Sequence, residues 1–332
     1  MRRRELVLAA VAAPLALGPG ARLSGAARRG GTPLALVTAD VEAHVAAVLL
    51  GTGKTIARIR TEPGPRSIES RLASQAVVAH TEHGLVSVID GVELEVSRVI
   101  AGFEQPRYTA VRGPLDFYGG SEAIAYVTDS GSEVVVTLDL VRGRILRRTS
   151  VPGPARHIGI SPDGATLWTA LGTKAERIAV LDVRDARRPR LVRTFAPPWL
   201  AHDVVFSPWG SVWVTSGSER SIAVYRPGRE PPRLHDGDAP PQHIAFTRER
   251  AFVASGDDGV VRVHRRDGAL LRRTRVPLGA YNVTVGSSVG SERLITPSLD
   301  GGTVAVLDTA GRVRHVRQVA RAAHDACFVV SA

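Results

Sequence analysis

One pattern recurs along this chain roughly every 40 residues. Each copy begins with an apolar run, a turn and a second apolar run. A polar turn follows, and then a third run such as IAVLD (178–182), a basic fourth run and a loop that contains Pro or Gly. The third runs align at seven places: 44–50, 85–90, 134–139, 178–182, 222–226, 260–265 and 304–308. Four short strands in a repeat of this length predict the blades of a β-propeller.

The residues that open the first runs, which we call the anchor positions, have spacings of 39 to 49 residues. They are Ser67, Tyr108, His157, His202, His243, Asn282 and His324. The chain starts its pattern with a second-type run, LALVTAD (34–40), and ends it with a lone first-type run, DACFVVS (325–331). We therefore expect one blade to combine three N-terminal strands with one C-terminal strand, which closes the ring and removes free sheet edges.

The prediction is an all-β, seven-bladed propeller with four-stranded antiparallel blades over residues 32–332. The abundance of Gly (33) and Pro (21) fits a turn-rich and strand-rich chain. Cys327 is the only cysteine, so no intramolecular disulfide can form and packing must supply the stability. We expect Cys327 to be a buried strand thiol.

Residues 1–27 have the pattern of a cleaved export signal. An Arg cluster precedes an apolar stretch from Leu6 to Leu17, which is followed by small residues, Gly and Pro. These twelve residues are too few to span a bilayer, which needs roughly 20. Arg3 and Arg4 also fit the twin-arginine pattern, and both that route and the general secretory route stay open. The expected location is periplasmic or extracellular in a bacterium, with no transmembrane segment after signal removal.

Several segments resemble the YVTN β-propeller repeat proteins, a YncE-like family within the lactonase-type propeller superfamily. They are HIGISPDGATLWTA (157–170), RIAVLDV (177–183), GSVWVTSGSERSIAVYR (210–226) and AIAYVTDSGSEVVVTLD (123–139). The resemblance covers residues 32–331 and implies a seven-bladed propeller. Two copies depart from it: 67–80 lacks the Pro-Asp-Gly turn, and 116–127 carries extra residues. The family includes exported proteins without assigned roles, and related propellers include lactonases and lyases, so the fold alone does not select an activity.

In such a propeller the anchor positions form a ring at one mouth of the central channel. The order His157, His202, His243, Asn282, His324, Ser67, Tyr108 places three histidines consecutively. Converging neutral imidazoles are ligands for zinc, copper, iron or nickel, so His157, His202 and His243 are the candidate metal ligands and a divalent metal the candidate cofactor. The candidate ligand-binding set adds Asn282, His324 and Tyr108.

Two other interpretations of these histidines stay open. Each histidine can instead bond a neighbouring blade's backbone, with Asp203 and Asp325 as candidate orienting groups, or can act as a general acid or base. The diameter of the ring is expected to keep non-adjacent blades several ångströms apart, farther than one ion with bonds of about 2.0–2.1 Å can span.

Further polar residues of the turns between second and third strands are expected at the same mouth. They are Asp40, Glu42, His80, His83, Asp129, Asp257, Asp258 and Asp300. Calcium binding or acid–base work is open to them, but hairpin-turn roles are favoured. GTGKT (51–55) lacks the first glycine of a phosphate-binding loop, and GSSVG (286–290) lacks the strand-turn-helix setting of a catalytic serine. Both are predicted to be hairpin turns.

The net charge is +11, and basic residues concentrate in the fourth runs, at 144–150, 190–195, 270–276 and 312–319. At the outer edge of a blade such charge either discourages edge-to-edge pairing or forms a basic binding rim. The 5% aromatic content argues against a nucleic-acid partner.

The favoured function is a monomeric, exported binding or scaffold protein that holds a protein, polymer or small ligand at the channel mouth, with a metal or an anionic ligand as the candidate ligand of the histidine arc at the anchor positions. A lactonase-type hydrolase or lyase at the same mouth is the alternative. No catalytic residue can be assigned from the sequence.

Overall fold

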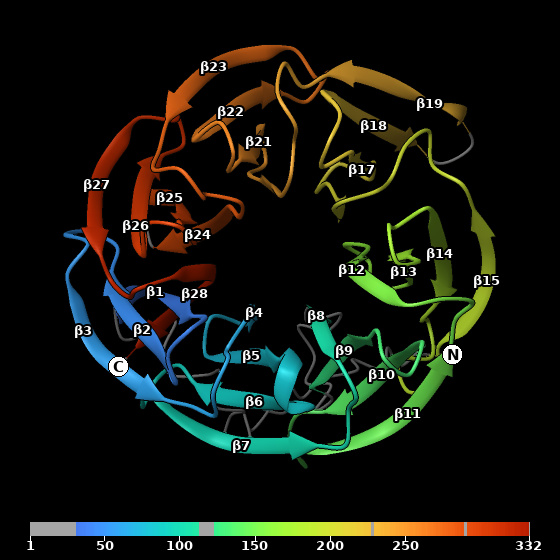
Figure 1. Cartoon of the computed structure of the whole chain (residues 1–332), viewed down its shortest axis with the longest axis horizontal. Coiled ribbons are helices and arrows are strands. Elements are labelled where there is room, and N and C mark those ends of the chain that lie inside the picture. Colours follow the sequence, from blue (N-terminus) through green and yellow to red (C-terminus); the bar gives the residue numbers. More distant parts are fainter. Residues whose placement is uncertain (1–30, 113–122, 227–228, 289–290, 332) are drawn as a thin grey trace, which may run out of the picture.

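The computed structural model describes residues 31–112, 123–226, 229–288 and 291–331, and these residues form seven four-stranded sheets in a ring (Figure 1). All neighbouring strands within a sheet are antiparallel, as the register of β9 with β10 illustrates. In Figure 1 the first strand of each sheet lies nearest the centre of the ring and the fourth lies at its outer edge. The predicted fold class is confirmed.

The blades follow the chain in order around the ring. The second blade comprises β4 (Ser67–Arg71), β5 (Gln75–His80), β6 (Leu85–Asp90) and β7 (Glu95–Ala101), with a short 3-10 helix, η1 (Thr81–His83), after β5. The third comprises β8 (Pro106–Val111), β9 (Ile124–Asp129), β10 (Val134–Asp139) and β11 (Arg144–Ser150). The fourth comprises β12 (Ala155–Ile160), β13 (Thr166–Leu171), β14 (Arg177–Asp182) and β15 (Arg190–Phe195).

The fifth blade comprises β16 (Val204–Phe206), β17 (Val212–Thr215), β18 (Ser221–Arg226) and β19 (Arg229–Asp236). The sixth comprises β20 (Ile244–Phe246), β21 (Arg250–Ser255), β22 (Val260–Arg265) and β23 (Leu270–Arg275). The seventh comprises β24 (Thr284–Ser288), β25 (Ser291–Pro297), β26 (Thr303–Asp308) and β27 (Val313–Gln318). The repeat unit of the sequence therefore corresponds to one blade.

The first blade closes the ring in the predicted way. Its strand order is β28 (Ala323–Ser331), β1 (Thr32–Ala39), β2 (His44–Leu49) and β3 (Thr55–Arg60). β28 pairs antiparallel with β1, and Leu36 lies opposite Cys327. Cys327 is a buried free thiol, as expected.

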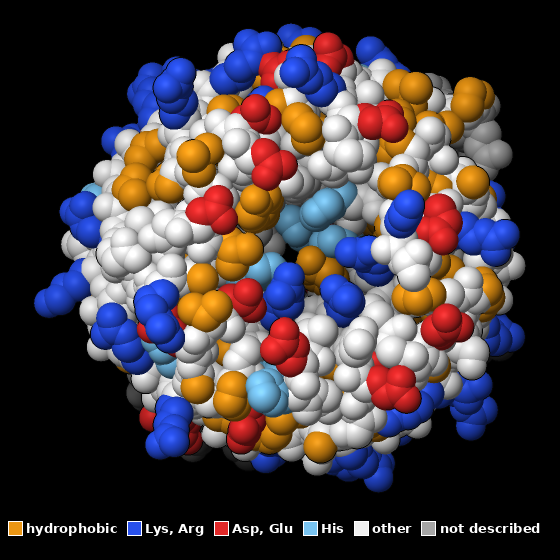
Figure 2. All heavy atoms as spheres, in the orientation of Figure 1, with side chains coloured by type: hydrophobic (Ala, Val, Ile, Leu, Met, Phe, Trp, Pro, Cys, Tyr) orange, Lys and Arg blue, Asp and Glu red, His pale blue; other side chains and the backbone are white. Residues whose placement is uncertain are grey.

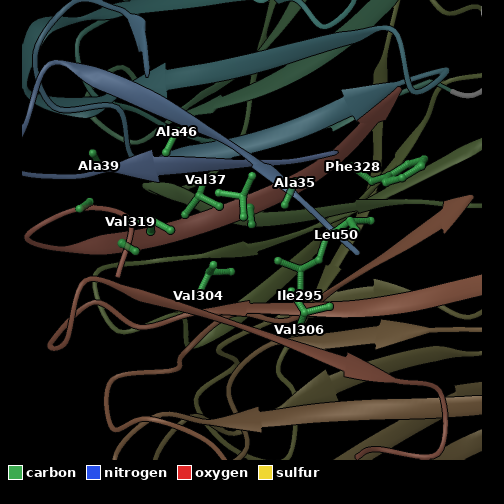
Figure 3. Packing of buried hydrophobic residues seen from close by; sticks show 14 residues of the cluster. Ala35, Val37, Ala39, Ala46, Leu50, Ile295, Val304, Val306, Val319 and Phe328 are labelled. Carbon is green, nitrogen blue, oxygen red and sulfur yellow. The ribbon is translucent and has the colours of Figure 1, made fainter. Parts of the chain in front are cut away.

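The hydrophobic core consists of apolar layers between neighbouring blades. Figure 3 shows one layer, in which Val37 and Phe328 of the first blade pack with Ile295, Val304 and Val306 of the seventh. Strands in the middle of a blade are covered on both faces, so β9 and β10 are buried along their whole length. Burying each large aliphatic side chain contributes about 1.5–3 kcal/mol, which lets the ring be stable without disulfides.

The basic fourth runs lie at the rim, as predicted. β11, β15, β23 and β27 contain them, and their arginines are largely exposed. None of the helices among the described residues has the length and apolar character that a membrane crossing requires.

The two discounted motifs occur where strands turn back on themselves. GTGKT lies between β2 and β3, where the hydroxyl of Thr52 accepts a hydrogen bond from the Lys54 N–H. Ser288 of GSSVG pairs with Ser291 across β24 and β25. The expected signal at residues 1–27 and most of the extra residues in the 116–127 copy lie outside the described residues.

A glycine allows two first strands to approach each other beside the channel. Gly159 lies in β12, and a Cβ built there would come within 2.3 Å of the Val204 carbonyl oxygen in β16. Any side chain at this position would push the fourth and fifth blades apart. Gly159 thus determines how closely the histidines carried by these blades can meet.

Candidate functional site

Three anchor histidines converge at the channel. His157 lies in β12, His202 two residues before β16 and His243 directly before β20. Their ring centroids are 4.7 Å apart for His157 and His202, 5.3 Å for His202 and His243, and 4.8 Å for His157 and His243. Each ring can offer one nitrogen such that the three nitrogens lie within 4.8 Å of one another.

His157 and His243 approach as closely as histidines of adjacent blades, although the blade of His202 lies between theirs. The three rings therefore meet although their strands belong to separate blades. Nitrogens up to 4.8 Å apart still exceed the span of about 4.2 Å that two bonds of about 2.1 Å allow, so one ion requires the rings to move inward.

His157 is buried without any hydrogen-bond partner. Its exposed fraction is 4%, and neither Nδ1 nor Nε2 has a partner. The ring of Tyr108 covers it, with centroids 3.7 Å apart. His80 shows the usual arrangement, because its two nitrogens contact the Pro63 carbonyl oxygen and the Ser87 hydroxyl at 2.9 Å each. An unpaired buried polar group costs about 1–3 kcal/mol, which a ligand at His157 would offset.

Burial keeps two of these imidazoles neutral. Desolvation, aided by the neighbouring histidines, lowers the pKa of His157 well below its usual value. The same cause, together with the charge of His243, lowers the pKa of His202 to about 3. Neutral imidazole is the form that coordinates a metal, so both rings are ready to bind at neutral pH.

His243 is oriented by a carboxylate. Its Nδ1 lies 3.3 Å from Oδ2 of Asp203, whose two oxygens also accept hydrogen bonds from the N–H groups of Val204 and Ile244. Burial alone would lower the pKa of His243, but the charge and hydrogen bond of Asp203 raise it above its usual value. Donation from Nδ1 leaves Nε2 as the free electron-pair donor, the arrangement found behind metal-binding histidines.

Of the other anchor residues, three line the channel cavity and His324 contacts a backbone carbonyl group. Ser67, Tyr108 and Asn282 line the same channel cavity as His157 and His243. His324 lies outside the three-histidine group, and its Nδ1 is 3.2 Å from the Arg66 carbonyl oxygen of the next blade. The alternative of a backbone-bonding histidine thus fits His324, and burial lowers its pKa to about 3.

The turn residues of the mouth have structural contacts. Asp129 accepts hydrogen bonds from the N–H groups of Glu104 and Gln105, at 3.0 and 2.7 Å. Asp257 accepts a hydrogen bond from the Tyr281 hydroxyl. These contacts are structural, but they join different segments of the chain and do not lie within one hairpin turn.

The channel cavity has a volume of about 260 Å³ and is lined by Asp203 and Asp325, the predicted orienting groups, and by Glu69, which was not predicted. Glu69 lines the channel cavity, and its side chain is exposed to that cavity. Desolvation inside the channel, together with the charge of Asp325, raises its pKa to about 8. Burial also raises the pKa of Asp325 to about 6, although Ile68 and Ala326 donate N–H bonds to it. Glu69 stands two residues after the anchor Ser67, so strand alternation was the signal that could have identified it.

The fold and the site define a seven-bladed β-propeller with a cluster of three histidines in its channel. Hydrazine synthase of Kuenenia stuttgartiensis is a similar solved structure, with 18% identity, a TM-score of 0.67, and coverage of 81% of this chain and 90% of that one. A functionally unknown protein of Desulfotomaculum acetoxidans is similar over 90% of this chain and 99% of its own, with 13% identity and a TM-score of 0.73. Streptogramin B lyase is similar over 76% of this chain and 82% of its own, with 11% identity and a TM-score of 0.62.

No family model and no curated protein matches the chain. At these identities the three likenesses establish the fold alone.

Proposed function

We propose that this protein is an exported metal-binding β-propeller that holds one divalent transition-metal ion between His157, His202 and His243. The observation that carries the proposal is His157, which is 4% exposed and has no partner at either ring nitrogen. Three imidazoles suit zinc, copper, iron or nickel rather than calcium or magnesium. Membership of the YVTN repeat family and an extracytoplasmic location are parts of the same proposal, supported by the repeat motifs and by residues 1–27.

A modest inward movement of the rings would complete the site. A tetrahedral ion with bonds of about 2.0–2.1 Å keeps its ligand nitrogens about 3.3 Å apart. The nitrogens of this cluster lie within 4.8 Å of one another, so rotation of the side chains closes the difference. Three protein ligands leave a fourth position that water or a bound partner can take.

The test is the metal content of protein purified without an affinity tag. We expect about one transition-metal ion per chain, lost in a His202→Ala/His243→Ala variant and kept in a His83→Ala/His315→Ala variant, whose histidines contribute nothing to the cluster. Added Zn²⁺ at about 100 times its Kd should stabilise the metal-free protein by about 2.7 kcal/mol. Equal metal content in both variants, or no metal together with no thermal shift from Zn²⁺ or Cu²⁺, would contradict the proposal.

A hydrolase or lyase of the lactonase type is the second candidate function. It is favoured by Glu69, which shares the cavity with His157 and whose pKa of about 8 suits a proton-transfer group. Streptogramin B lyase, one of the similar structures, is an enzyme by its name. Turnover of a lactone panel that disappears in Glu69→Gln, while the metal stays bound, would support an enzyme. If the metal-loaded protein turns over none of the lactones, the enzyme hypothesis is contradicted and metal binding is the only proposed function that stands.

A further inference from the structure

Three arginines stand beside the histidines at the channel mouth. Arg66, Arg107 and Arg156 each immediately precede an anchor residue, in three successive blades, and we call them the arginine triad. Figure 2 shows Lys and Arg side chains gathered with histidines around the central hollow of this face. In the other four copies the same position holds Ala201, Gln242, Tyr281 and Ala323. The positive charge is therefore confined to one side of the mouth.

The triad has few anionic partners among the described residues. Arg66 reaches Asp40 at 3.7 Å, and its side chain is 39% exposed. Arg156 donates to the Thr173 carbonyl oxygen at 2.6 Å and lies in no ion pair of the described chain. Arg107 forms no ion pair there either, and its Nε is buried without a hydrogen-bond partner. An unpaired buried donor on a guanidinium is costly unless a ligand satisfies it.

The triad members repel one another. Burial, and then the charges of Arg156 and Arg66, lower the pKa of Arg107. Acidic residues do occur close by: Asp40, Glu42, Glu82 and Glu104 line an adjoining hollow with Arg66 and Arg107. Of these four, only Asp40 lies within ion-pair distance of a triad arginine in the described chain. Arg107 and Arg156 therefore have no ion-pair partner among the described residues, although carboxylates lie nearby.

We infer that the arginine triad is a binding site for a small oxyanion with two or more negative charges, a phosphate group or a polycarboxylate. Guanidinium groups match both, because their planar N–H fork can bond two oxygens at once. All three arginines are half-buried, which strengthens their attraction for an anion relative to fully exposed side chains. Arg156 and Arg107 adjoin His157 and Tyr108 in sequence, so an anion held here lies at the entrance to the histidine cluster. The site does not require a metal.

The experiment is calorimetric titration of metal-stripped protein with inorganic phosphate and, separately, with tricarballylate, at about 50 mM salt. We expect a Kd below about 1 mM for at least one of them. Binding of phosphate alone assigns a phosphoryl ligand, binding of tricarballylate alone assigns a polycarboxylate, and binding of both assigns recognition by charge and fork geometry.

Variants then locate the site. Arg107→Met and Arg156→Met should each raise the Kd about tenfold or more. Arg147→Met removes an exposed arginine of β11 and should leave the Kd unchanged. Because the triad members repel, Arg107→Met should also keep or raise the melting temperature in anion-free buffer, which shows that the variant is folded. The His202→Ala/His243→Ala variant should bind the anion as the parent does, which separates this inference from the proposed metal centre.

Either of two results would overturn the inference. One is the absence of binding by the parent protein at millimolar concentrations of both anions. The other is an equal loss of affinity in Arg147→Met, because that would mean general attraction by a basic surface rather than a site.

Discussion

Asp203 precedes the fifth blade's first strand and orients a histidine of the sixth: its carboxylate lies 3.3 Å from Nδ1 of His243. His202 directly precedes Asp203 in the chain, and Nδ1 of His202 has no hydrogen-bond partner. Asp325 repeats the backbone part of this arrangement at another blade junction. It accepts from Ala326 and from Ile68 of the next blade, just as Asp203 accepts from Val204 and Ile244.

This repetition supplies a matched pair of variants. Asp203→Asn and Asp325→Asn should both lose about 1–3 kcal/mol of stability through their backbone bonds. Asp203→Asn should lower the pKa of His243, seen by NMR titration, more than Asp325→Asn does, because Asp203 acts through both its charge and a hydrogen bond and Asp325 through its charge alone. Only Asp203→Asn should weaken Zn²⁺ binding about 10- to 100-fold in a chelator competition. An equal loss of zinc affinity in both variants would show that the Asp203–His243 contact does not tune the metal centre.

The metal-free protein should lose stability as the pH falls below about 6.5. The pKa of His157 is lowered in the folded state, so the unfolded chain binds more protons below the ordinary histidine value of 6.5. Protonation of this histidine in the unfolded chain alone can lower the free energy of unfolding by up to about 1.4 kcal/mol per pH unit in that range. His243 acts in the opposite sense, because its raised pKa adds stability at low pH that is lost as the pH rises through it.

Urea unfolding between about pH 7.5 and pH 4.5 separates these contributions. His157→Gln should flatten the acid side of the stability profile, whereas His83→Gln, at an exposed position, should follow the parent protein. Parallel profiles for the parent and His157→Gln would mean that folding does not lower the pKa of His157.

Gly159→Ala should disturb both the fold and the histidine cluster. The added methyl group would meet the Val204 carbonyl oxygen at 2.3 Å, and overpacking of this kind costs about 1–3 kcal/mol. Zinc affinity should fall with it, because the blades of His157 and His202 are forced apart. Gly51→Ala is the control, since nothing lies within 4 Å of its added Cβ, and its stability should stay within about 0.5 kcal/mol of the parent. Unchanged zinc affinity in a folded Gly159→Ala protein would contradict this account.

Cys327 should report on opening of the ring. It is 2% exposed, and burial raises the pKa of its thiol well above the usual value, so a disulfide reagent should react only after β28 separates. Leu36→Ala removes a fully buried side chain opposite Cys327 and should accelerate the labelling. Leu167→Ala creates the same defect in the fourth blade, and an equal acceleration there would mean that the ring opens only as a whole.

The fold was predictable because each blade repeats the same strand pattern and the incomplete ends complement each other. Local runs such as IAVLD (178–182) fix which strand they form, and β14 contains this one. The positions of the anchor residues at the channel followed from that alignment.

The contacts of the site were not predictable in the same way, because they join blades. That His157 lacks partners while His324 bonds the Arg66 carbonyl oxygen depends on distances across the channel, and both residues occupy the same repeat position. The close approach of His157 and His243 was missed because it depends on side-chain positions and not on spacing along the ring alone. The arginine triad did leave a signal, since Arg precedes the anchor in three successive copies.

Closure of the ring by β28 also bears on how the protein is made. Residues 323–331 emerge from the ribosome after every other described strand, yet β1 needs them to cover its open edge. At 5–20 residues per second the edge of β1 stays unpaired for roughly 15–60 s of translation. During that interval the nascent chain presents an apolar strand that invites pairing with other chains, so a chaperone that shields β1 would raise the yield of closed rings more than one that acts on any interior blade.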